Sequence, residues 1–111
     1  MTDGDNRSWA DRWRHDSEDW VDAENAASLL ENMRSIVFAQ KVSELLATDP
    51  KMAINRAENT IKSGVEWEEY VRSELTARKV ANLKKIKAEH TKMKYYECQS
   101  QEANSRAEMR L

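Results

Sequence analysis

Glycine and proline are nearly absent from this chain of 111 residues, which holds two glycines (Gly4 and Gly64) and one proline (Pro50). Sheets need turns between their strands, and turns depend strongly on glycine and proline. Residues that favour helix, chiefly Ala, Glu, Lys, Arg, Leu and Met, occur throughout. The sequence therefore predicts an all-α fold, and its length fits one domain of about 100 to 200 residues.

The few helix-breaking residues divide the chain into segments. Apolar residues recur at spacings of three and four over residues 21–48, which predicts a first helix there. Asp49-Pro50 interrupts this pattern and favours a short second helix over about 50–63, because Asp is a preferred N-cap and Pro suits the first helical position. Beyond Val65 no Gly or Pro follows, so we expect one long C-terminal helix from about 65 to beyond 95.

Within the first helix, residues 36–46 are apolar on nearly all sides. A helix that is apolar all round must be surrounded by protein. The sequence therefore predicts the centre of the core at these residues, with Phe38 and Leu45 buried. Residues 21–111 are expected to form a single helical domain.

The N-terminal segment is acidic and carries three tryptophans. Residues 1–24 hold eight acids and three arginines, a balance of −5. We expect residues 1–20 to form a flexible arm, and Trp9, Trp13 and Trp20 are candidate partner-binding residues because Trp is enriched in interface hot spots. The alternative is that these indoles cover the core of the protein itself.

The long C-terminal helix is expected to carry a narrow apolar stripe, interrupted by Lys79 and Asn82, that comprises Val71, Leu75, Leu83, Ile86, His90 and Met93. Its spacing is closer to that of a coiled-coil seam than to that of a wide globular face. The other predicted helices are too short to cover a helix of about 40 residues, which would measure about 60 Å. We therefore expect a helical hairpin or bundle that is completed by oligomerisation, most simply a homodimer in which Leu83, Ile86 and Met93 contact the second copy.

Seven cations follow one another along the same helix: Arg78, Lys79, Lys84, Lys85, Lys87, Lys92 and Lys94. Residues 72–111 as a whole hold ten bases and five acids, a balance of +5. Such a run can neutralise phosphates, and Tyr95 and Tyr96 beyond it are suited to stacking on bases. The alternative is that the cations pair with acids of a neighbouring helix, or with the acidic arm, and the sequence pI of about 5.7 favours this second reading.

Residues that commonly carry catalysis or bind metals are sparse. His15 lies at four-residue spacing from Asp11 and Asp19, which can form a weak metal site but is more typical of a solvated acidic helix face. His90 falls on the apolar stripe, and Cys98 lacks a neighbour that would activate its thiol. No catalytic residue, metal site or cofactor is predicted, and the chain is not expected to be an enzyme.

The C-terminal stretch from Ala88 to Leu111 ends in Ala-Asn-Ser-Arg-Ala-Glu-Met-Arg-Leu. It resembles the ends of small helical proteins of unknown function that temperate phages and prophages encode. The resemblance covers about a fifth of the chain and implies a mobile-element origin, but no reaction.

These features favour a non-catalytic helical interaction protein that self-associates and binds a protein partner that the sequence does not identify. The alternative function is a nucleic-acid-binding accessory protein that uses the basic run over residues 78–94. One cysteine, an acidic start and the lack of a long apolar segment predict a cytoplasmic location and no membrane span.

Overall fold

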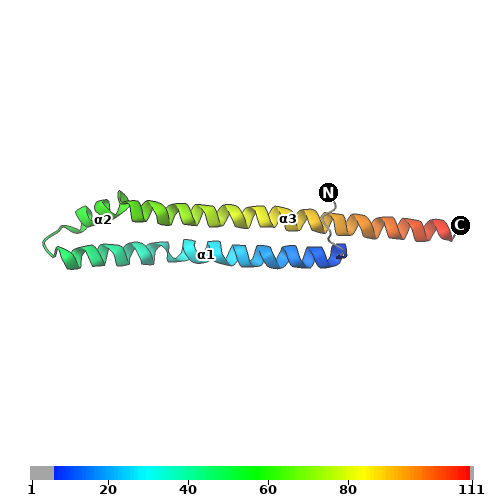
Figure 1. The fold of residues 1–111 in the computed structure, drawn as a ribbon, viewed down its shortest axis with the longest axis horizontal. Coiled ribbons are helices and arrows are strands. Elements are labelled where there is room, and N and C mark those ends of the chain that lie inside the picture. Colours follow the sequence, from blue (N-terminus) through cyan, green and yellow to red (C-terminus); the bar gives the residue numbers. More distant parts are fainter. Residues whose placement is uncertain (1–6, 111) are drawn as a thin grey trace. The chain divides into compact units, whose positions relative to one another are not determined.

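The computed structural model describes residues 7–110 and contains three helices in this part of the chain, which confirms the all-α prediction (Figure 1). Helix α1 spans Trp9–Thr48, α2 spans Ile54–Lys62 and α3 spans Val65–Met109. The predicted end of the first helix and the predicted start of the long helix are both confirmed.

The chain divides into two compact units. The terminal unit comprises residues 1–23 and 80–111, and the hairpin unit comprises Glu24–Lys79. In each unit, the segments of α1 and α3 lie side by side and run antiparallel (Figure 1).

Helix α1 begins at Trp9, so the prediction of a flexible arm over residues 1–20 is wrong for residues 9–20. Ser8 explains the early start, because its Oγ accepts a hydrogen bond from the Asp11 backbone N–H at 3.1 Å and so caps the helix. Asp11 also places a negative charge in the first turn, where the helix dipole favours it. Residues 1–6 of the predicted arm lie outside the described residues.

Helix α2 begins later than the sequence predicts, at Ile54 rather than Pro50. The Met52 N–H donates to the Asp49 carbonyl at 3.1 Å, which closes a turn with Pro50 in its second position. Asp and Pro are favoured at these two positions of a type I turn. Asp49 and Pro50 therefore end α1 and reverse the chain, and they do not cap α2.

Gly64 joins α2 to α3 where the backbone is crowded. A Cβ atom at this position would lie 3.3 Å from the Ile61 carbonyl oxygen. The Ser63 hydroxyl donates to the carbonyls of Asn59 and Thr60, at 2.9 and 3.3 Å, so it completes the end of α2. This compact connection lets α3 begin directly at Val65.

Small side chains fill the interior of both units. The buried apolar residues are Ala27, Ala57, Ala81 and Ala88, and no large side chain is fully buried among residues 7–110. In the terminal unit, most of the buried and half-buried positions of α3 alternate at spacings of three and four, as in a coiled coil; they are Ala81, Lys84, Ala88, Thr91, Tyr95 and Cys98, with the half-buried Lys94 beside them. A seam built on alanine lets two helices approach closely but buries little apolar area.

The prediction of a core centred on residues 36–46 is wrong. Phe38 and Leu45 are half-buried, and Ile36 is 52% exposed. Each helix has one long neighbour within its unit, so it can bury one side only. The apolar residues on the remaining sides of this segment therefore stay at the surface.

The alanine seam yields a stability prediction. Replacing Ala81 or Ala88 by Leu should lower the stability of the protein by about 1 to 3 kcal/mol, because the added atoms must force the helices apart. Ala103→Leu is the matched control, since Ala103 is an exposed residue of the same helix. Thermal unfolding followed by circular dichroism measures the effect, and equal melting temperatures for all three variants would contradict the seam.

Candidate interaction surface

The three tryptophans of the acidic segment are half-buried in the terminal unit. The Trp13 ring lies 5.3 Å from the Tyr95 ring and 5.9 Å from the Tyr96 ring, measured between centroids. The Lys92 Nζ lies 6.0 Å from the Trp13 ring centroid, and the Lys85 Nζ lies 5.8 Å from that of Trp20. Trp13 and Trp20 thus pack against α3, as the alternative reading of these indoles expected.

Trp9 lies beside its own helix, with the Arg12 guanidinium carbon 4.6 Å from its ring centroid. Cation–π contacts of this kind contribute about 0.5 to 1 kcal/mol when exposed. The acidic segment thus forms a helix that lies along the basic part of α3 within this unit. Its three tryptophans are in contact with neighbouring side chains but remain half-exposed.

A polar cluster bridges α1 and α3 beside these rings. Asp16 is 6% exposed, and one of its carboxylate oxygens accepts a hydrogen bond from the Thr91 hydroxyl at 2.5 Å. The Lys87 Nζ lies 3.7 Å from the other oxygen. The buried carboxylate is therefore satisfied by two groups of α3, which ties one register of the two helices together.

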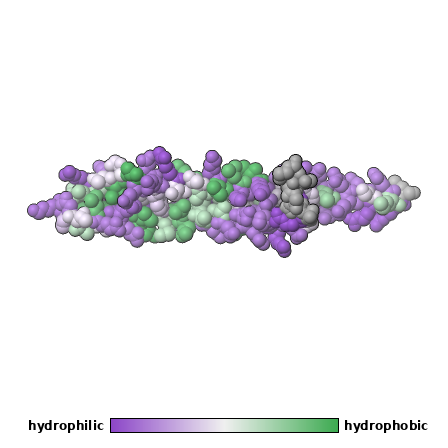
Figure 2. All heavy atoms as spheres, viewed as in Figure 1, coloured by the Kyte–Doolittle hydropathy of each residue, from purple (hydrophilic) through white to green (hydrophobic). Residues whose placement is uncertain are grey.

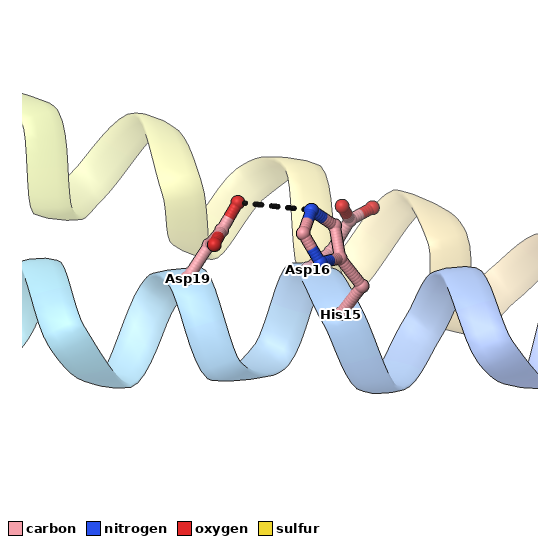
Figure 3. Close-up of side chains that lie close together, drawn as sticks. All are labelled: His15, Asp16 and Asp19. Atoms are coloured by element: carbon pink, nitrogen blue, oxygen red, sulfur yellow. Dashed lines mark ion pairs between the residues drawn. The ribbon is translucent and has the colours of Figure 1, made fainter.

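His15, Asp16 and Asp19 place one potential ligand atom each within 4.8 Å of one another (Figure 3). His15 Nε2 lies 3.5 Å from an Asp19 carboxylate oxygen, which in turn lies 3.7 Å from the Lys84 Nζ. The structure thus joins His15 to Asp19 as the sequence expected, whereas Asp11 lies near Arg14, at 3.9 Å. Because both carboxylates face lysines of α3, the group acts as an ion-pair bridge between helices.

Arg78 makes the strongest polar contact of the hairpin unit. Its guanidinium donates to Glu31 through Nε and Nη2, at 2.8 and 2.6 Å, and to both oxygens of Glu24 through Nη1, at 2.8 and 2.9 Å. Bidentate pairs of this type are the strong, geometrically specific ones. These hydrogen bonds raise the pKa of Arg78 and lower that of Glu31, so both groups remain charged at neutral pH.

The basic run is therefore largely engaged within the protein. Arg78, Lys84 and Lys87 face carboxylates of α1, and Lys94 lies 3.4 Å from Glu97 on its own helix. Lys85 and Lys92 lie over tryptophan rings, and Lys79 is exposed. Most of these seven cations thus connect α3 to α1, as the pairing alternative expected.

Aromatic residues gather at the other end of the hairpin unit. Trp67 stacks on Tyr70 at 5.3 Å and lies 5.1 Å from Phe38, and the Tyr70 hydroxyl donates to the Leu30 carbonyl at 2.5 Å. An open hollow of about 470 Å³ borders this group and is lined by Glu31, Arg34, Ser35, Phe38, Lys62 and Trp67. These rings hold α1 against α3 where alanine is missing from the seam.

Large apolar side chains lie on the side of α3 that faces away from the alanine seam. In the terminal unit they are Leu83, Ile86, Met93 and Tyr96, with 55%, 62%, 70% and 53% of their surface exposed. Figure 2 shows hydrophobic side chains at the surface over both long helices. The structure thus leaves the predicted partner-binding residues Leu83, Ile86 and Met93 accessible within the protomer.

A second exposed apolar group lies on α1 in the hairpin unit, and the sequence reading missed it. Leu29, Met33 and Ile36 are 58%, 39% and 52% exposed. Their spacing of four and three predicted the first helix but not an exposed surface. The available signal was the lack of charge around them, which is unusual in a chain with 34% charged residues.

No known protein family matches this chain, and neither do any curated proteins or solved structures. The resemblance to phage-encoded and prophage-encoded proteins therefore stays a prediction. Over the residues that the structure describes, none of the helices combines the length and the apolar character that crossing a membrane requires.

The Arg78 contacts predict a pH-dependent stability. The hydrogen bond from Arg78 lowers the pKa of Glu31 below its ordinary value of 4.5. A carboxyl group whose pKa is lower in the folded state stabilises the fold above its unfolded pKa and loses this effect as the pH falls through the folded pKa. The melting temperature of Glu31→Gln should therefore lie below that of the parent at neutral pH and approach it as the pH falls below the ordinary carboxyl pKa of 4.5.

Melting curves recorded from neutral to acidic pH measure this effect. Glu44→Gln removes an exposed carboxylate of the same helix and serves as the control. A difference between parent and Glu31→Gln that stays constant over the whole range would contradict the role of the Glu31 charge.

Proposed function

We propose that the protein is a small helical interaction protein that self-associates and acts by binding rather than by catalysis. The observation that carries this proposal is the inverted distribution of its apolar residues. Alanines occupy the interior of both units, whereas several large apolar side chains of α1 and α3 are 52 to 70% exposed, namely Leu29, Ile36, Leu75, Leu83, Ile86 and Met93.

This distribution is unfavourable for an isolated protomer. Full burial of a Leu, Ile or Met side chain is worth about 1.5 to 3 kcal/mol. Exposed apolar groups that line one side of a helix are typical of surfaces that bind another protein. Contact with a second chain would bury side chains that the protomer cannot cover.

The two apolar surfaces differ in their charge. The α3 group is formed by Leu83, Ile86, Met93 and Tyr96. It lies between the exposed Lys85 and Lys92 on one side and the exposed Lys87 and half-buried Lys94 on the other. Two copies that met through this group would bring like charges together. This surface, which the sequence suggested for the second copy, therefore suits a protein partner that carries acidic residues around an apolar helix face.

The nucleic-acid alternative has less support. Binding to phosphates requires several free cations along one surface. Arg78, Lys84 and Lys87 already pair with carboxylates of α1, which leaves a smaller and more dispersed positive charge. We therefore favour a protein partner over a nucleic acid.

Sedimentation equilibrium over a range from low to high micromolar concentration tests the proposed self-association. We expect the average mass to rise from 12.9 kDa toward twice that value as the concentration increases. Added salt should change this rise little, since apolar contacts are screened far less than ion pairs. A monomer at every concentration would refute the proposal.

A further inference from the structure

One exposed face of α1 in the hairpin unit is free of charge; we refer to it as the neutral face. It consists of Asn25, Ala26, Leu29, Asn32, Met33, Ile36, Ala39, Gln40 and Ser43. Every one of these residues is exposed, although 34% of the chain is charged. A continuous uncharged strip on so charged a protein requires a physical reason.

The spacing of these residues places them on one side of the helix. Residues 26, 29, 33, 36 and 40 alternate at intervals of three and four, which is the spacing of a helix–helix seam. This side differs from the one that faces α3, where Ala27 is fully buried and Leu30 is half-buried. Helix α1 therefore has two sides with the spacing of a helix–helix contact, one that packs against α3 and one that is exposed to solvent.

The composition of the neutral face is that of an interface core. Charged residues are depleted and Met is enriched at the centre of protein interfaces. Asn and Gln side chains within a helical seam fix its register, because their amides must pair across it. A neutral surface can also meet an identical surface without like-charge repulsion, which the lysine-bordered side of α3 cannot do.

Three pairs of like residues on the neutral face are placed symmetrically about one point, between Asn32 and Met33. Ala26 and Ala39 are equally distant from this point, as are Leu29 and Ile36. The amides Asn25 and Gln40 follow the same rule. In an antiparallel pair of helices with a two-fold axis at this point, Ala26 would meet Ala39, Leu29 would meet Ile36 and Asn25 would meet Gln40. Asn32 and Met33 would lie beside each other at the axis.

A parallel pair does not require such symmetry, because each residue then meets its own counterpart. In an antiparallel pair residue i contacts residue j and residue j contacts residue i, so a symmetric order of residues is what lets like side chains meet. The antiparallel arrangement also opposes the two helix dipoles favourably. An open groove of about 640 Å³, lined by Ile36, Ala39, Gln40, Ser43 and Glu44, borders the place that Leu29 and Asn25 of the second copy would occupy.

We infer that two copies of this chain associate through the neutral face of α1, antiparallel, with the two-fold axis between Asn32 and Met33. This inference rests on the proposed self-association and specifies its surface and register. It leaves the apolar group of α3 free for a different protein partner.

Disulfide cross-linking tests the register, in a Cys98→Ser background that removes the one native thiol. Leu29→Cys and Ile36→Cys are prepared as separate single variants. An equimolar mixture of the two should give a covalent dimer on mild oxidation, whereas each variant alone should not, because a disulfide needs Cβ atoms about 3.5 to 4.5 Å apart. Cross-linking of each variant with itself, and not in the mixture, would establish a parallel pair and overturn the inference.

A charge placed on the neutral face provides a second test. Leu29→Glu should weaken the dimer by about tenfold or more, because it places two like charges in an uncharged seam. Leu75→Glu is the matched control: Leu75 is a comparably exposed Leu of the same unit, 65% against 58%, but lies on α3, so this variant should dimerise as the parent does. Circular dichroism of both variants then checks that they keep their helical content.

The outcomes separate the inference from the proposed function. A parent protein that stays monomeric refutes both. A parent that dimerises while Leu29→Glu has no effect, or while Ile86→Cys on α3 cross-links with itself in the same background, keeps self-association and refutes the neutral face.

Discussion

The close approach of α1 and α3 at alanine is the constraint on which the other features of this protein depend. Ala81 and Ala88 in the terminal unit, and Ala27 in the hairpin unit, are almost completely buried. A seam of such small residues brings two helices together but removes little apolar area from water. Several of the larger apolar residues, among them Leu29, Ile36, Leu83 and Ile86, therefore lie on the outward sides of the two helices.

Polar contacts supply the register that alanine does not specify. Alanines fit one another in several registers, whereas Asp16 can meet Thr91 and Lys87, or Glu24 and Glu31 can meet Arg78, in one register only. Exposed ion pairs contribute little to stability, at about 0 to 1 kcal/mol each. Their main effect here is specificity, which explains why the acidic start of α1 and the basic part of α3 occur in one chain and pack within one unit.

The helical content, the break at Asp49-Pro50 and the start of the long helix at Val65 followed from the sequence because each depends on local chemistry. The side of each helix that is buried did not follow from the sequence, because the prediction placed the largest apolar residues inside. Because each long helix packs against one other long helix, alanines occupy the buried positions, and Phe38 and Leu45 are half-buried. The early start of α1 was missed because Ser8 and Asp11 were not considered as a cap.

For the candidate surfaces, too, some features could be predicted from the sequence and others depend on how the helices pack. The opposite charges of the two ends of the chain indicated that acids and bases would pair, but the particular partners of Arg78 and Lys87 depend on the packing of the helices. The exposed residues of the α3 stripe were identified from periodicity. The neutral face was not identified, because Ile36 was placed in the predicted core and the spacing of Leu29 and Met33 was used only to predict the first helix.

The distribution of small residues inside and large residues outside is measured most directly by NMR, from the relaxation of side-chain methyl groups by a soluble paramagnetic agent. The methyls of Ala81 and Ala88 should be protected from the agent, whereas those of Leu83 and Ile86 on the same helix should relax strongly. Protected Leu83 and Ile86 methyls together with accessible alanine methyls would show that α3 packs through its other side, and would contradict the alanine seam.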